Sequence, residues 1–221
     1  MIKLVIFDLD DTLISEKEYV KSGFKAVSKY IEQTYSIKNA WQELLGLFEQ
    51  DAKLVFNRFL EKHHISYTKE QIIQMIDVYR THEPSICFFH DVIPTCQFLK
   101  EHGIKIAILS DGYLETQKAK VKAVKADELF DEIFLTDSLG KDYWKPSPKG
   151  FEILQEKFKV NYSEMLYVGD NPQKDFYIQK IHPVHTVRIL RENSVYEKAT
   201  YLEDIKEEYT IHNLEELKQI L

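Results

Sequence analysis

The chain has 221 residues, a length that accommodates one main hydrophobic core with an inserted or appended lobe. Apolar residues make up 44% of the chain and charged residues 29%, which is typical of a soluble globular protein. The formal net charge of −7 argues against the backbone of a nucleic acid as the main partner. A local group of positive side chains could still bind a phosphate.

The sequence carries no pattern of a disulfide framework, a secretory leader or a membrane span. The two cysteines, Cys87 and Cys96, lie in no C-x-x-C pair and beside no histidine cluster, so zinc and redox roles are not expected. The apolar N-terminal run is interrupted by Asp8 and Asp10, unlike a signal peptide. No run of about 18 apolar residues could cross a bilayer. These features predict a cytoplasmic protein that does not use a membrane as partner.

The first part of the chain predicts one strand followed by a helical lobe. Residues 2–7 (IKLVIF) form a short apolar run that is typical of a strand buried on both faces. From about residue 16 to residue 82, apolar residues recur at helical spacing, as Val20, Phe24, Val27 and Ile31 do. We therefore expect residues 15–88 to form an all-helical domain inserted into a second domain made of residues 1–14 and 89–221.

From about residue 89 the pattern alternates between helices and strands. The first expected elements are a helix over 92–102, a strand over 104–109, a helix over 113–126 and a strand over 132–136. A helix from Pro148 to Phe158, capped by Ser147, comes next. Strands over 165–168, 184–190 and 209–211 follow, and a final helix is capped by Asn213 and Glu216. Such alternation implies a parallel sheet covered on both faces. The predicted fold class is α/β, with a Rossmann-like parallel sheet and an inserted all-helical lobe.

Polar residues follow several of these strands directly. They are Asp8 and Asp10, Ser110 and Asp111, and Asp170 with Asp175 five residues later, while Lys145 lies in the loop ahead of a helix. In open parallel sheets, ligands bind at the carboxyl ends of the strands. We therefore expect these side chains to meet at one edge of the sheet.

The chemistry of this set favours a metal ion and a phosphate. Asp8 and Asp170 offer hard carboxylate oxygens, which suit Mg²⁺ together with water and substrate phosphate. Ser110 offers a hydroxyl and Lys145 a positive charge, and both groups can bind a phosphoryl group. Asp8 is also a possible nucleophile, because carboxylates form aspartyl-phosphate intermediates.

Four segments, DLDDT, LSDG, WKPSP and GDNPQKD, occur in this order along the chain. They resemble the four motifs of the haloacid dehalogenase-like hydrolase superfamily, and the helical lobe resembles the C1-type cap of that family. The resemblance implies that Asp8 is the nucleophile and a metal ligand. It implies that Asp10 is the general acid and later the base, and that its backbone carbonyl binds the metal.

The resemblance also assigns the remaining residues. Ser110, with the adjoining Asp111, and Lys145 would hold the transferring phosphoryl group. Asp170 would bind Mg²⁺, and Asp175 would act beside the metal, directly or through water or a neighbouring group.

The function that these residues favour is a Mg²⁺-dependent phosphatase acting on a small phosphorylated metabolite through an aspartyl-phosphate. A phosphosugar mutase keeps the same residues and is the enzymatic alternative, and a catalytically idle binding or regulatory relative is the alternative from another class. Dehalogenases and phosphonatases are disfavoured because their branches of the family lack the second aspartate, which is Asp10 here. Specificity is expected to reside in the helical lobe, with residues 36–42 as the candidate loop. The sequence predicts neither the substrate nor the oligomeric state.

Overall fold

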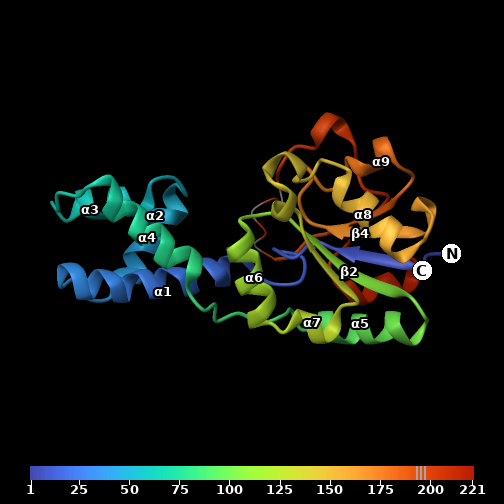
Figure 1. Ribbon diagram of the computed structural model, residues 1–221, viewed down its shortest axis with the longest axis horizontal. Helices are drawn as coiled ribbons and strands as arrows, with labels where there is room; N and C mark the ends of the chain where they lie inside the picture. The colour runs from blue at the N-terminus through green and yellow to red at the C-terminus, as the bar shows by residue number, and fades with distance from the viewer. Residues whose placement is uncertain (193, 195, 197) are drawn as a thin grey trace. The chain divides into compact units, whose positions relative to one another are not determined.

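The computed structural model describes residues 1–192, 194, 196 and 198–221 (Figure 1). The chain divides into two compact units. The larger one comprises Met1–Ser15 and Cys87–Leu221, and the smaller one comprises Glu16–Ile86. The smaller unit is thus an insertion between the first strand and the rest of the larger unit.

The larger unit is built on a six-stranded sheet with the order β3-β2-β1-β4-β5-β6, in which every pair of neighbours is parallel. The strands are β1 (Leu4–Phe7), β2 (Lys105–Ser110), β3 (Glu132–Leu135), β4 (Met165–Gly169), β5 (His185–Ile189) and β6 (Tyr209–Ile211). The inserted position of the helical unit and the parallel sheet confirm the predicted fold class. Because β1 lies between β2 and β4, its carboxyl end is flanked by theirs.

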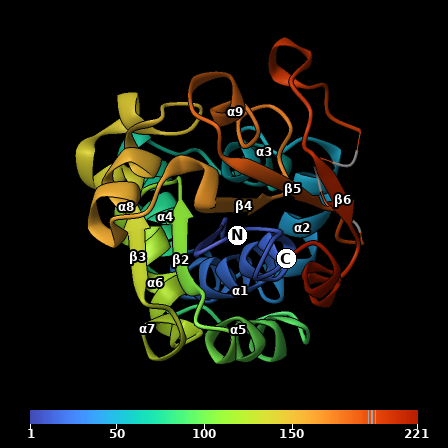
Figure 2. The same cartoon turned by 90° about the vertical axis from the view of Figure 1, so that its right-hand side faces the viewer.

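Helices cover both faces of the sheet, as Figures 1 and 2 show with α5 and α7 on one side and α8 and α9 on the other. The helices of this unit are α5 (Val92–Glu101), α6 (Leu114–Ala123), α7 (Ala126–Leu129), α8 (Lys149–Phe158) and α9 (Ile178–Ile181), with 3₁₀ segments η1 (Thr136–Leu139), η2 (Lys141–Tyr143), η3 (Tyr162–Glu164), η4 (Leu202–Asp204) and η5 (Leu214–Gln219). Leu4 and Ile6 of β1 share a buried cluster with Phe151 of α8. On the other face, Phe7 packs edge-on against Phe130, with ring centroids 6.0 Å apart. The alternation of side chains along β1 thus fills both layers of the core.

Three predicted helices differ in detail from the structure. The predicted helix over 113–126 is two helices, because Lys125 between them adopts a left-handed conformation with φ of 53°. The helix predicted to begin at Pro148 with Ser147 as its cap begins at Lys149. Its N-cap residue is Pro148, and Ser147 Oγ only accepts a long hydrogen bond of 3.4 Å from the N–H of Lys149. Asn213 and Glu216 form the predicted capping box, but the segment they open is a 3₁₀ helix.

The smaller unit is a bundle of four helices, α1 (Glu16–Tyr35), α2 (Ala40–Gln50), α3 (Val55–Lys62) and α4 (Lys69–Thr81). Its core includes Phe24, Ile31, Leu44, Phe59 and Met75, which are contributed by all four helices. This unit is helical throughout, as the apolar spacing predicts. The candidate specificity loop over 36–42 is shorter than expected, because its last three residues already belong to α2.

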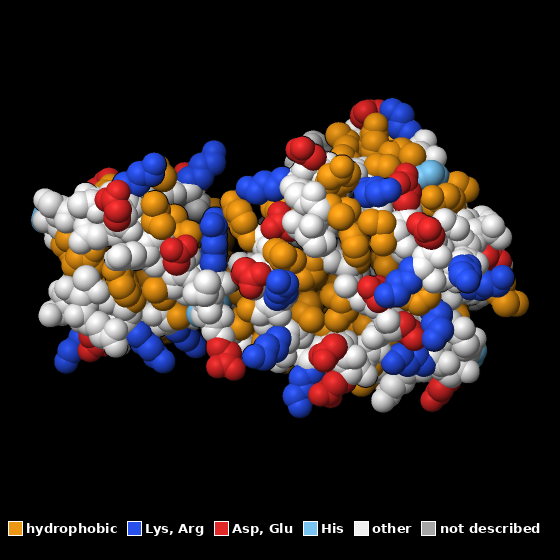
Figure 3. All heavy atoms as spheres, viewed as in Figure 1, with side chains coloured by type: hydrophobic (Ala, Val, Ile, Leu, Met, Phe, Trp, Pro, Cys, Tyr) orange, Lys and Arg blue, Asp and Glu red, His pale blue; other side chains and the backbone are white. Residues whose placement is uncertain are grey.

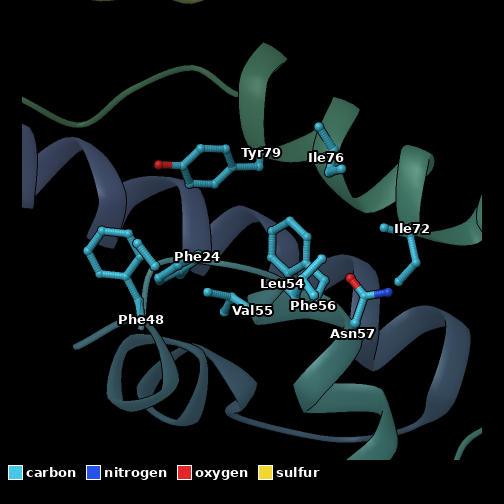
Figure 4. Close-up of a pocket in the computed structure, with 10 residues that line it drawn as sticks. Phe24, Phe48, Leu54, Val55, Phe56, Asn57, Ile72, Ile76 and Tyr79 are labelled. Atoms are coloured by element: carbon cyan, nitrogen blue, oxygen red, sulfur yellow. The ribbon is translucent and has the colours of Figure 1, made fainter. Parts of the chain in front are cut away.

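A pocket of about 280 Å³ opens within the helical unit (Figure 4). Its lining is mostly apolar and comprises Phe24, Phe48, Ala52, Leu54, Val55, Phe56, Asn57, Ile72, Ile76 and Tyr79. Leu54 is 70% exposed although it is a large apolar residue, and its φ of 53° is left-handed. The amide of Asn57 supplies a polar group and donates to the hydroxyl of Tyr67 at 3.2 Å.

Acidic and basic side chains are interspersed on the face of the larger unit that is shown in Figure 3. That face therefore presents no extended field of a single sign. Over the part of the chain that the structure describes, no helix is both long enough and apolar enough to span a membrane.

Candidate active site

The side chains expected to carry the chemistry meet at the carboxyl edge of the sheet. Asp8 follows β1 directly, Ser110 is the last residue of β2, and Asp170 follows β4. Phe7 of β1 is in register with Val168 of β4, and the backbone N–H of Asp8 donates to the carbonyl of Val168 at 2.8 Å. The parallel register of three central strands therefore places all three side chains at one edge.

Lys145 reaches this edge from the loop that precedes α8. Its Nζ lies 2.9 Å from Oδ1 of Asp8 and 2.9 Å from Oδ1 of Asp175, and it also donates to the hydroxyl of Tyr167. Burial alone would lower the pKa of Lys145, but the charges of Asp175 and Asp8 outweigh burial and raise that pKa well above its usual value. Lys145 is therefore a fixed positive charge beside the predicted nucleophile.

Asp8, Asp170 and Asp175 form a cluster of buried carboxylates. Each offers one oxygen, and these oxygens all lie within 4.8 Å of one another. Burial, opposed by Lys145, raises the pKa of Asp8 to about 6. Burial and the neighbouring charges of Asp175 and Asp8 raise the pKa of Asp170 well above its usual value. Hard oxygens crowded in this way fit a divalent cation such as Mg²⁺, which would offset their repulsion.

Asp175 is fully buried. Its Oδ2 accepts a hydrogen bond from the backbone N–H of Asn171 at 2.9 Å, and its Oδ1 accepts one from the hydroxyl of Tyr167 at 3.1 Å. Gly169 leaves room for this carboxylate, since a Cβ at that position would lie 2.4 Å from Oδ2. The Asp175 carboxylate is therefore held in place from several sides.

Asp10 is contacted by two side chains of α6. Nζ of Lys120 lies 2.6 Å from its Oδ1, and Nε2 of Gln117 donates to its Oδ2 at 2.9 Å. Nε2 of Gln117 also lies 2.8 Å from Oγ of Ser110 and 2.7 Å from the carbonyl oxygen of Asp111. The Gln117 amide thus joins the loops that follow β1 and β2.

The carboxylate of Asp111 is engaged within the protein. It accepts hydrogen bonds from the backbone N–H of Lys145 at 3.1 Å, from Thr136 Oγ1 at 2.8 Å and from Lys174 Nζ at 2.9 Å. Burial would raise the pKa of Asp111, but the charges of Lys145 and Lys174 outweigh burial and lower it. An anionic side chain in these contacts is not suited to hold a phosphate. The predicted phosphate contact of Asp111 would therefore use its backbone N–H.

A family model described as a haloacid dehalogenase-like hydrolase matches residues 2–176. The chain belongs to the haloacid dehalogenase-like hydrolases. The match confirms the resemblance that the four sequence motifs carry, and it identifies the chain as an enzyme of this hydrolase family.

Curated relatives of this hydrolase carry phosphatase names. The glyceraldehyde 3-phosphate phosphatase of Methanocaldococcus jannaschii is 26% identical over 238 residues, which cover 100% of this chain and 97% of that protein. Pyrophosphatase PpaX of Halalkalibacterium halodurans is 30% identical over 176 residues, which cover 77% of this chain and 75% of that protein.

Solved structures share the fold of this hydrolase. The HAD-hydrolase YfnB from Bacillus subtilis, bound to magnesium, superposes with a TM-score of 0.71 at 17% identity, covering 100% of this chain and 98% of that one. A HAD-superfamily hydrolase from Geobacter sulfurreducens gives a TM-score of 0.69 at 15% identity, covering 100% and 96%. At such identities the likeness shows the fold alone.

Four residues near the candidate site were not predicted from the sequence. They are Gln117 and Lys120, which contact Asp10, together with Tyr167 and Lys174. Lys174 lies inside the segment GDNPQKD, so its place in a motif could have indicated that it lies near the site. Gln117 and Lys120 are three residues apart on a helix and so share a face, but the spacing alone does not show which face meets the site.

Proposed function

We propose that this hydrolase is a Mg²⁺-dependent phosphatase that cleaves small phosphomonoesters through an aspartyl-phosphate at Asp8. The observation that carries the proposal is the position of Asp8, whose carboxylate lies 2.9 Å from Lys145 and within a cluster of three buried acids. Such a site supplies a nucleophile, a fixed positive charge and ligands for a cation. The name of the glyceraldehyde 3-phosphate phosphatase points to the same reaction class, and the name of pyrophosphatase PpaX points to the related cleavage of a phosphoanhydride.

The residues present fit a bound Mg²⁺. Asp8 and Asp170 would hold it with their carboxylates and Asp10 with its backbone carbonyl, while Asp175 lies within reach as a further oxygen. When bound, the ion would neutralise negative charge on the phosphoryl oxygens and favour in-line transfer.

The first proposed step is attack by a carboxylate oxygen of Asp8 on phosphorus. A bond forms between that oxygen and phosphorus, and the bond between phosphorus and the ester oxygen breaks. Asp10 transfers its proton to the departing oxygen, so the alcohol leaves neutral. Ser110, Lys145 and the backbone N–H of Asp111 hold the phosphoryl oxygens during the transfer.

In the second step the roles of the two aspartates change. Asp10, now a carboxylate, accepts a proton from a water molecule as that water attacks phosphorus. The bond between phosphorus and Asp8 breaks, which releases inorganic phosphate and restores the Asp8 carboxylate. Asp10 is left protonated, ready for the next ester.

The names of the relatives guide the choice of substrates for this protein. Glyceraldehyde 3-phosphate and pyrophosphate are the first two to test, and phosphoglycolate, sugar phosphates and nucleoside monophosphates follow. Discrimination among these substrates is proposed to reside in the helical unit, because the residues at the sheet edge would bind only the phosphoryl group and the cation. A cytoplasmic location, which the sequence favours, stays a prediction.

The test is phosphate release from this panel with Mg²⁺ and with EDTA. The wild-type protein should release phosphate from at least one ester only with Mg²⁺, and Asp8→Asn should abolish release. Asp127→Asn is the matched control, because Asp127 is an exposed carboxylate on α7. No release from any ester by a folded protein would contradict the phosphatase and favour a mutase or an idle binding module.

A further inference from the structure

The carboxylate of Asp10 is held by α6 in a way that the proposed reaction does not by itself explain. Lys120 Nζ lies 2.6 Å from Oδ1, and Gln117 Nε2 donates to Oδ2 at 2.9 Å, so both carboxylate oxygens are engaged. The side chain of Lys120 is 4% exposed and that of Asp10 is 21% exposed. A buried lysine that meets a half-buried carboxylate is not an ordinary surface ion pair.

Gln117 ties this contact to the phosphate side of the site. The same Nε2 lies within 2.9 Å of acceptors on Asp10, Ser110 and Asp111, and the residue is 1% exposed. Gly112 makes the approach possible, since its φ is 125° and a Cβ there would lie 3.1 Å from Cδ of Gln117. The position of the Asp10 carboxylate is thereby coupled to the position of the Ser110 hydroxyl.

We infer that Gln117 and Lys120 are positioning residues that place the carboxyl of Asp10 at the leaving oxygen of the substrate. This inference rests on the proposed function and deepens it. Neither residue needs to touch the reacting atoms, because each acts through Asp10 or Ser110. Two contacts from one rigid helix face fix the carboxyl, whereas a single contact would leave it free to rotate.

If Lys120 or Gln117 is replaced, the displaced carboxyl of Asp10 should slow the first step by an amount that depends on the leaving group. An alkyl phosphate needs a proton on its departing oxygen, whereas 2,4-dinitrophenyl phosphate releases a stable anion and needs none. General acid catalysis contributes about 10²- to 10⁴-fold, so in the first step a misplaced acid costs rate only with the first kind of ester. The second step, in which Asp10 is the base, is the same for both esters, so the comparison uses kcat/KM, which reports the transfer to Asp8 and not the later hydrolysis. A merely structural role of Lys120 would lower kcat/KM equally for both esters.

The experiment compares glycerol 2-phosphate with 2,4-dinitrophenyl phosphate in Lys120→Met, Lys120→Arg and Gln117→Leu. For Lys120→Met we expect kcat/KM on the alkyl ester to fall by about tenfold or more, with kcat/KM on the aryl ester changed by less than about threefold. Lys120→Arg should restore part of the loss. Lys122→Met is the matched control, because Lys122 is exposed on the same helix. An equal fall in kcat/KM on both esters, or no fall, would overturn the inference.

A second readout does not depend on activity. The unfolding midpoints of Lys120→Met, Asp10→Asn and the double variant form a double-mutant cycle. We expect the shifts in unfolding midpoint to depart clearly from additivity. Additive shifts would show that Lys120 and Asp10 do not interact. If the wild-type protein released phosphate from no ester of the panel above and from neither of these two, the proposed function and the catalytic part of this inference would both fail. The double-mutant cycle would still show whether Lys120 and Asp10 interact.

Discussion

Lys145 Nζ lies 2.9 Å from Oδ1 of Asp8, and both side chains are almost completely buried. In water such a pair would be weak, but within the protein the charge of Lys145 has little screening and acts directly on the reacting carboxylate. We predict that Lys145→Met lowers kcat/KM by about hundredfold or more, because a fixed charge on the transferring phosphoryl group is lost.

The measurement is steady-state phosphate release at saturating Mg²⁺. Lys100→Met serves as control, since Lys100 is an exposed lysine on α5 of the same unit. Activity of Lys145→Met within a few-fold of wild type would contradict the role of Lys145 in the site.

Binding of Mg²⁺ should depend on pH in a definite direction. Without the ion, the pKa of Asp8 is raised to about 6, mainly by burial, so the folded protein retains a proton there to higher pH than the unfolded chain does. The ion must displace that proton, and its apparent affinity therefore falls as the pH drops through about 6.

We predict that Mg²⁺ raises the unfolding midpoint clearly at about pH 7.5 and little at about pH 5, as measured by thermal denaturation. Asp170→Asn should show no such Mg²⁺-dependent rise at either pH, because a predicted ligand is missing. Equal stabilisation of the wild-type protein at both pH values would refute this linkage.

Gly169 is predicted to be intolerant of even one methyl group. A Cβ at Gly169 would lie 2.4 Å from Oδ2 of Asp175, so the buried carboxylate must shift. We expect Gly169→Ala to lower Mg²⁺ affinity about 10- to 100-fold, because Asp175 would lose its alignment with the cluster. Destabilisation of about 1–3 kcal/mol should accompany the change.

Gly46→Ala provides the matched control, because no atom lies within 4 Å of a Cβ built there on α2. We expect it to stabilise the protein by about 0.5–1 kcal/mol through helix propensity and to leave Mg²⁺ affinity unchanged. Isothermal titration of both variants makes the comparison, and indistinguishable affinities would exclude a role of Gly169 in placing Asp175.

A buried ion pair supports the loop that follows β1. Arg191 donates to both oxygens of Asp91, at 2.6 and 3.0 Å, and also to the carbonyl of Thr12. Burial would raise the pKa of Asp91, but hydrogen bonds from Arg191 and from the backbone of Leu214 outweigh burial and lower it. The pair therefore stabilises the fold above the unfolded pKa of an aspartate, and this contribution is lost as the pH falls through the lowered pKa.

We predict that Arg191→Met destabilises the protein by about 3 kcal/mol at neutral pH, since it leaves a buried charge without its partner. The difference from wild type should shrink in acid, because Asp91 of the variant then becomes protonated. Urea unfolding at both pH values measures the effect. Lys105→Met, which breaks an exposed pair with Asp131, should cost less than about 1 kcal/mol. A pH-independent loss in Arg191→Met would show that the charge of Asp91 is not the cause.

The fold was largely predictable because apolar periodicity reports burial directly. Within the predicted run 2–7, Leu4–Phe7 is buried on both faces as strand β1, and Phe24 and Ile31 fill the core of the helical unit. Helix ends were less predictable, because they depend on single dihedral angles. The left-handed conformation of Lys125 divides α6 from α7, and nothing in the local composition marks it.

The grouping of the candidate site residues was predictable where a residue adjoins a strand end. Asp8, Ser110 and Asp170 lie in such positions, and topology alone then brings them together. Gln117 and Lys120 could not be predicted, because their contacts with Asp10 depend on how α6 is rotated about its axis. That rotation is set by packing between distant segments, which periodicity does not specify.

The proposed reaction requires that Asp8 becomes covalently phosphorylated. Its most direct test is to mix excess enzyme with an ester that it hydrolyses, quench in acid within one turnover, and map phosphorylation by peptide mass spectrometry. We predict one phosphoryl group on the peptide containing Asp8, located at Asp8 itself and missing in Asp8→Asn. Phosphate release with no phosphorylated peptide at any quench time, and with turnover retained in Asp8→Asn, would contradict nucleophilic catalysis by Asp8.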